Sequence, residues 1–128
     1  MLQRTRSTRK EKIAEEIRQE VSQIIQLELL DPRVEGVSVT HVKMTSDLRL
    51  ARVYFNVSGN PRPIKEIEAG LKSATGVIKS AIADRLVMKF VPNIEFFYDE
   101  TEELQKKIDL LFQEIEAKKT EKQNSEDE

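Results

Sequence analysis

The chain has 128 residues, of which 38% are hydrophobic and 34% are charged, and its formal net charge at pH 7 is -2. This size and hydrophobic content predict one compact domain with a single core, and they argue against a second domain. The chain has no cysteine and one histidine, His41, which excludes disulfides, thiolate metal sites and histidine clusters.

The first predicted element is a helix from about Thr8 to Leu30, which Asp31-Pro32 ends. Its apolar residues form one stripe at helical spacing: Ile13, Ile17, Val21, Ile24 and Ile25. The basic segment before it lacks the apolar core of a signal peptide, and no run approaches the roughly 20 apolar residues that span a bilayer. We therefore expect a cytoplasmic protein without a membrane segment.

A β-hairpin is predicted next, opened by Gly36. Val37 and Val39 alternate with polar residues, whereas Val42 and Met44 alternate out of phase, which indicates a bulge near His41. The second strand is expected to begin at Leu48, after a turn at residues 45–47. Along it the apolar and polar faces alternate: Ala51, Val53, Phe55 and Val57 against Arg52, Tyr54 and Asn56.

After a loop at residues 58–63, Pro63 lies near the start of the next helix. Two short helices are predicted to meet without a loop at Ala74-Thr75-Gly76, where Gly76 would let the backbone kink as a structural requirement. Pro92 then prevents helix continuation, and residues 94–98 alternate as a third strand.

A last helix is predicted, with Asp99 and Glu102 as a capping pair. Its stripe is narrow enough to be buried by its own domain: Leu104, Ile108, Leu111 and Ile115. We expect one domain over residues 1–117 and a disordered acidic tail over residues 118–128. The fold class is α+β, in the order α-β-β-α-α-β plus a C-terminal helix, with helices on one face of a three-stranded sheet.

Charge is unevenly distributed along the chain. Residues 1–92 hold 16 Lys and Arg against 11 Asp and Glu, a net charge of +5, whereas residues 93–128 hold 5 against 12, a net charge of -7. A basic body with an acidic end favours one surface that faces a nucleic acid, although some segregation of charge arises by chance.

The order α-β-β-α-α-β resembles a type II KH domain, whose consecutive helices normally enclose a GxxG loop. Here Ala74-Thr75-Gly76 stands in place of that loop, and this AxG junction resembles the ribosome-binding factor A family. Further matches are Asp31-Pro32-Arg33, Ser46-Asp47-Leu48 and the segment from Pro92 to Phe96. The resemblance covers about residues 5 to 115. The chain departs from the family pattern at residues 100–103, where the family often has Ser and Gly.

The resemblance implies a KH-like assembly factor, not an enzyme, that needs no cofactor, metal or small-molecule substrate. It implies binding to the free small (30S) ribosomal subunit and 16S rRNA, promotion of late 16S rRNA processing, a role in cold adaptation, and an association with assembly GTPases. We expect a monomer, since no dimer stripe is evident.

Candidate RNA-binding residues lie at the amino terminus and around the AxG junction. A flexible basic arm is expected to hold Arg4, Arg6, Arg9, Lys10 and Lys12. The junction group is Lys72, Ala74, Gly76, Lys79, Arg85 and Lys89, with Arg85 and Lys89 four apart on the second helix. The ordinary alternative is that each basic side chain is a solvated surface charge.

Base stacking by aromatic residues and acid–base catalysis are two further alternatives. Tyr54 and Phe97 would stack on bases if they face outward, but aromatic residues more often complete a core. His41 near Asp47 has no evident third partner, so catalysis is not expected. Two other classes of function stay open: a helix-turn-helix DNA-binding protein that uses residues 76–86, and an adaptor that docks a protein on its last helix.

Overall fold

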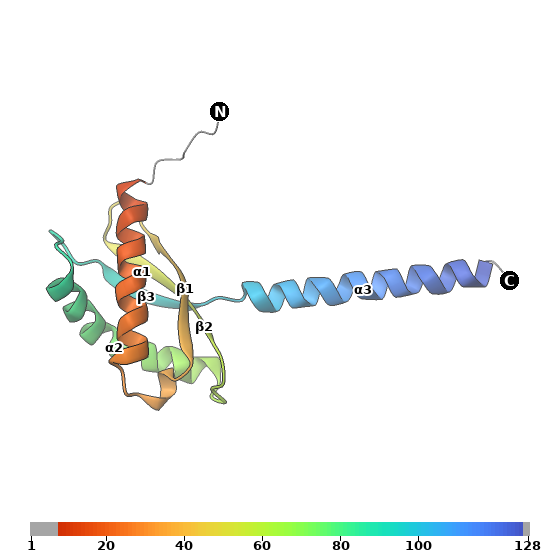
Figure 1. Ribbon diagram of the computed structural model, residues 1–128, viewed down its shortest axis with the longest axis horizontal. Helices are drawn as coiled ribbons and strands as arrows, with labels where there is room; N and C mark the ends of the chain where they lie inside the picture. Colours follow the sequence, from red (N-terminus) through yellow and green to blue (C-terminus); the bar gives the residue numbers. More distant parts are fainter. Residues whose placement is uncertain (1–7, 127–128) are drawn as a thin grey trace.

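The computed structural model describes residues 8–126. Its elements are α1 (Arg9–Leu27), the 3-10 helix η1 (Pro32–Val34), β1 (Val37–Met44), β2 (Leu50–Val57), α2 (Ile64–Arg85), β3 (Asn93–Tyr98) and α3 (Thr101–Glu126). The strands form one sheet in the order β1-β2-β3, with β1 antiparallel and β3 parallel to β2. α1 and α2 cover one face of this sheet, and α3 extends away from the body (Figure 1). The predicted α+β class and three-stranded sheet are confirmed.

Helix α1 begins with a capping box. The Thr8 hydroxyl accepts from the Glu11 backbone N–H at 3.2 Å, and the Glu11 carboxylate accepts from the Thr8 N–H at 3.1 Å, so two otherwise unpaired donors are satisfied. The predicted stripe is buried from Ile17 to Ile25. The predicted end at Leu30 was wrong, because α1 stops at Leu27 and Asp31 instead caps η1 by accepting from the Arg33 N–H at 2.9 Å.

The hairpin confirms the predicted bulge, since the register of β1 against β2 shifts between Val39 and His41. The extra residue turns both Thr40 and His41 away from the core, whereas Ala51, Val53 and Phe55 of β2 are buried beneath the helices. β2 begins at Leu50 rather than at the predicted Leu48. Leu48 lies in the turn with φ 60°, a left-handed conformation that cannot continue a strand.

The two short helices predicted around Gly76 are one continuous helix, α2. The backbone turn that a helix-turn-helix requires is therefore missing from this part of the chain, and the helix-turn-helix interpretation was wrong. The hydroxyls of Ser73 and Thr75 donate to the carbonyls of Ala69 and Lys72 at 3.0 and 2.7 Å. Such bonds from helical hydroxyls to backbone carbonyls bend helices, and the two halves of α2 run in different directions on either side of α1 (Figure 1).

Three expectations for the last helix were wrong. α3 does not end near Ala117 but continues to Glu126, because the residues there include no Gly or Pro and are rich in Lys, Glu and Gln, which favour helices. Asp99 accepts from the Thr101 N–H at 3.0 Å, yet Glu102 bonds to the Asn56 amide at 2.9 Å instead of completing a capping box. The α3 stripe is not buried by the domain, since its four side chains are 44% to 58% exposed.

Candidate nucleic-acid interface

A groove of about 650 Å³ opens where four segments meet: the start of α1, the turn between β1 and β2, the second half of α2 and the loop before β3. Its charged lining residues are Arg9, Arg49, Lys79 and Lys89, with Glu16 and Asp47. Four cations against two carboxylates give the groove a net positive lining, which attracts phosphates. The fold thus brings together three predicted candidates, Arg9, Lys79 and Lys89, from segments that are far apart in the sequence.

Arg49 is a lining residue that sequence reasoning missed. Its position depends on Asp47, whose carboxylate accepts from the Thr45 hydroxyl at 2.7 Å and from the Arg49 N–H at 3.1 Å. These bonds lower the pKa of Asp47, and the positive charge of Arg49 lowers it further. The turn is joined to β3, because the Asn93 N–H donates to the Arg49 carbonyl at 2.8 Å.

Lys79 is held at the edge of the groove, since its Nζ donates to the Asn93 side-chain carbonyl at 2.9 Å. Lys89 does not lie on the helix as predicted, because α2 ends at Arg85 and the next residues lead to β3. In that loop Phe90 and Val87 are largely or fully exposed, and the Lys89 Nζ lies 5.7 Å from the Phe90 ring centroid. The loop therefore offers a cation and an aromatic side chain to the same groove.

Gly76 lies on the exposed surface of α2, one turn before Lys79. A Cβ atom built there meets no atom within 4 Å, and its φ is not positive. No contact with another part of the described fold therefore requires glycine at this position, and a requirement set by the backbone of α2 itself stays a prediction. A glycine inside a helix is less stable than alanine by about 0.5–1 kcal/mol. Its absent side chain leaves the helix backbone open to close approach by a ligand.

The other candidates near the junction differ in their surroundings. Lys72 is exposed and Ala74 is half-buried against the core. Lys72, Gly76 and Lys79 follow one another at spacings of four and three residues, which places them along one face of α2.

Arg85 is turned toward α1 instead of the groove. Its guanidinium pairs with Glu20 at 3.4 Å and also with Glu28. The hydrogen bond from Arg85 lowers the pKa of Glu28, and the same bond raises the pKa of Arg85. Two carboxylates beside one guanidinium make a poor phosphate site, so Arg85 joins α2 to α1.

The predicted basic arm is helical from Arg9 onward. Arg9, Lys10 and Lys12 are exposed on the first turn of α1, while Arg4 and Arg6 lie outside the described residues. Cations at a helix N-terminus oppose the helix dipole. Helix stability therefore does not explain why this turn is basic.

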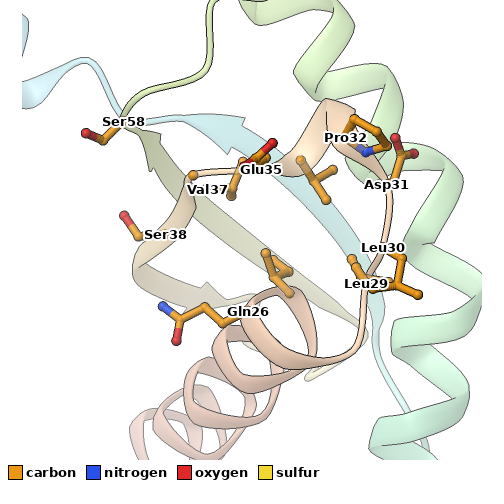
Figure 2. A pocket seen from close by; sticks show the side chains of 12 residues that line it. Gln26, Leu29, Leu30, Asp31, Pro32, Glu35, Val37, Ser38 and Ser58 are labelled. Carbon is orange, nitrogen blue, oxygen red and sulfur yellow. The ribbon is translucent and has the colours of Figure 1, made fainter.

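A second pocket, of about 570 Å³, lies between the end of α1, η1 and the start of β1 (Figure 2). Its charged lining residues are Asp31 and Glu35, and Ile25, Leu29 and Val37 supply apolar walls. Carboxylates repel phosphates, so this pocket does not suit a nucleic-acid backbone.

His41 lies beside Asp99 and not beside Asp47, the residue it was compared with in the sequence. Its Nδ1 is 3.5 Å from the Asp99 carboxylate, which also accepts from the Thr40 hydroxyl at 2.7 Å. Hydrogen bonds from Thr101 and Thr40 lower the pKa of Asp99 to about 2, so this carboxylate stays ionised. Over residues 8–126 no group of three His, Cys, Asp or Glu side chains is placed to hold a metal ion. No described helix is long and apolar enough to cross a membrane.

Comparison with known proteins assigns this architecture. The model of the ribosome-binding factor A family matches residues 9–112. A ribosome-binding factor A from Geobacter sp. (strain M21) is 42% identical over 109 residues, which are 85% of this chain and 92% of the relative. The crystal structure of ribosome-binding factor A from Thermus thermophilus has a TM-score of 0.64 at 25% identity, covering 70% of this chain and 93% of that one.

A further structural match concerns a complex. A homology model of the Thermus thermophilus ribosome binding factor A, fitted into a cryo-EM map of a 30S complex, has a TM-score of 0.57 at 24% identity. It covers 67% of this chain and 90% of that chain. The solved structures confirm the predicted KH-like fold class, and the match to the family extends from α1 into the first half of α3.

Proposed function

We propose that this chain, which belongs to the ribosome-binding factor A family, binds the free small (30S) ribosomal subunit through 16S rRNA and promotes late processing of that RNA. The Thermus thermophilus relative fitted into the map of a 30S complex supports this choice of partner. The protein would act where ribosomes are assembled, in the cytoplasm, and would matter most for growth in the cold, when misfolded rRNA rearranges slowly.

The groove is the observation that carries the proposal. Arg9, Arg49, Lys79 and Lys89 reach it from four separate segments, so a phosphate backbone lying there would contact all four at once. Contacts to phosphates fix register and orientation without reading sequence. This suits a factor that must hold one conformation of a large RNA.

The face of α2 that holds Lys72, Gly76 and Lys79 would continue this contact beyond the groove. An RNA backbone can approach closely at Gly76 because no side chain lies there. Flanking lysines on the same face would then neutralise the adjacent phosphates. Such a contact with RNA would account for a glycine at this helix-interior position.

The proposed mechanism is binding without catalysis. The protein would bind one arrangement of immature rRNA more tightly than the alternative arrangements. This difference in affinity would shift the rRNA toward the bound arrangement, and it sets the largest shift that a ligand can produce. Maturation of the subunit would remove the binding site, and an assembly GTPase acting at the same stage would complete the release.

Co-sedimentation with purified 30S subunits, 50S subunits and 70S ribosomes tests the proposal. We expect selective binding to free 30S subunits that is lost in an Arg49→Glu, Lys79→Glu variant. A Lys65→Glu, Lys118→Glu variant changes the net charge equally but lies outside the groove, and it should bind like the parent. Equal binding of the parent to all three particles, or equal loss in both variants, would contradict the proposal.

A further inference from the structure

We infer that the open face of the sheet is a second RNA-binding surface, where unpaired bases stack on Phe97 and His41. This inference rests on the proposed function, since it identifies single-stranded RNA as a ligand of the same protein. It concerns the face opposite α1 and α2, whereas the groove lies at one end of the sheet.

Three rings form a row across this face. His41, Tyr54 and Phe97 are cross-strand neighbours in the register of β1, β2 and β3. The His41 and Tyr54 ring centroids are 4.2 Å apart with planes 12° from parallel, and the Tyr54 and Phe97 centroids are 5.6 Å apart. The strand alternation points all three rings away from the buried core formed by Val53, Phe55 and their neighbours.

The ends of the row are open. The His41 side chain is 41% exposed and Phe97 is 38% exposed, whereas Tyr54 lies between them with a neighbouring ring on each side. β3 is an edge strand, so the outer side of Phe97 borders solvent. Because α3 extends away from the body (Figure 1), it leaves this face of the sheet uncovered. A base could therefore extend the row at either end, with Tyr54 as a positioning residue.

Cations flank the row on the side toward the groove. Lys43 and Arg52 are paired across β1 and β2, each two residues from the ring of its own strand, His41 or Tyr54, and both are exposed. Within residues 8–126 neither forms a salt bridge. The Lys43 Nζ lies 5.8 Å from the Tyr54 ring centroid. Cations beside aromatic rings are the combination that binds single strands, because the cations neutralise phosphates while the rings stack on bases.

The open face continues from the groove along β3. Asn93, which accepts from Lys79 in the groove, is followed on the outward side by Glu95 and then Phe97. Four residues of a strand span on the order of 13 Å. That reach is short enough for one RNA strand to leave the groove, pass Arg52 and place its bases on the rings.

Affinity for a single-stranded oligouridylate, measured by fluorescence anisotropy with the full chain, tests the inference. The variants are Phe97→Ala and His41→Ala, with Phe97→Tyr as the conservative control that keeps a ring. We expect Phe97→Ala to weaken binding about tenfold, the loss typical of one stacked base. Phe97→Tyr should restore most of the affinity, and binding to an RNA duplex should not change in any variant, because duplex bases are already stacked.

Unchanged oligouridylate affinity in both alanine variants would overturn the inference. If those variants instead lower the thermal midpoint or alter self-association while RNA affinity is kept, the rings are a packing surface for α3 or for a second copy, and the inference also fails. Co-sedimentation of the parent with 30S subunits is scored separately, so loss of the stacking surface and failure of the proposed function are distinguishable.

Discussion

Replacement of Gly76 by alanine should change the stability of the protein and its binding to 30S subunits in opposite directions. A Cβ atom at residue 76 meets nothing within 4 Å, so the methyl group creates no clash inside the protein. Alanine is favoured over glycine in a helix interior by about 0.5–1 kcal/mol. For a domain of this size that gain raises the thermal midpoint by about 2 to 5 °C.

The same substitution should weaken binding to 30S subunits, since the methyl group would stand where the RNA backbone approaches α2. We expect a more stable protein that binds about tenfold less tightly, a loss of about 1.4 kcal/mol. Thermal and urea denaturation measure the stability, and co-sedimentation measures the binding. A stabilised variant with unchanged binding would refute the argument that RNA, and not the fold, requires glycine here.

Gly70 provides a matched control in the same helix. A Cβ atom there would lie 2.9 Å from the Arg33 Cβ and 3.1 Å from the Val34 Cγ1, because α2 packs closely on η1. Overpacking of this kind costs about 1–3 kcal/mol, which exceeds the helix-propensity gain. Gly70→Ala should therefore lower the thermal midpoint. A rise in the midpoint like that of Gly76→Ala would show that the space around the Cβ atom does not decide whether alanine stabilises or destabilises the protein.

Three further predictions follow from the charges. The Arg49→Glu, Lys79→Glu variant should reduce the slope of log affinity against log salt by roughly 1 to 2, since each lost phosphate contact removes about 0.7–0.9; an unchanged slope would place these residues outside the interface. Arg85→Ala should lower the thermal midpoint slightly but leave 30S binding intact, because Arg85 pairs with α1; impaired binding at full stability would contradict this. Asp99 has its pKa lowered from 3.8 to about 2 in the folded protein, so its stabilising effect is complete above the unfolded-state pKa and is lost as the pH falls toward 2. Discounted for solvent screening, Asp99→Asn should cost about 1 kcal/mol at neutral pH and nothing once the folded carboxyl is protonated, and an equal cost under both conditions would exclude this linkage.

The apolar stripe of α3 was predicted correctly to be helical but wrongly to be buried. Helical spacing from Leu104 to Ile115 correctly predicts a helix, because backbone hydrogen bonds and spacing depend only on residues three or four apart. Burial of that stripe depends on another surface being close. The Asp99–Thr101 cap and the bond from Asn56 to Glu102 fix only the start of α3 against the sheet.

Much of the secondary structure was therefore determined by sequence alone. The α1 stripe, the alternation in the three strands and the bulge before His41 follow from periods of 3.6 and 2, which neighbouring residues set. Element ends were less well predicted, as at Leu30 and Leu48, because capping and turn contacts compete there with periodicity.

The candidate site needed the tertiary structure. Arg9 and Lys89 line the same groove although they are remote along the chain. Arg85 does not line it, because its guanidinium pairs with Glu20 and Glu28. Sequence identifies such residues as basic, but it does not indicate which neighbours will compete for their charge. That is decided by how helices and strands pack, since the strength and the partner of each charged group depend on distances between segments that lie far apart in the sequence.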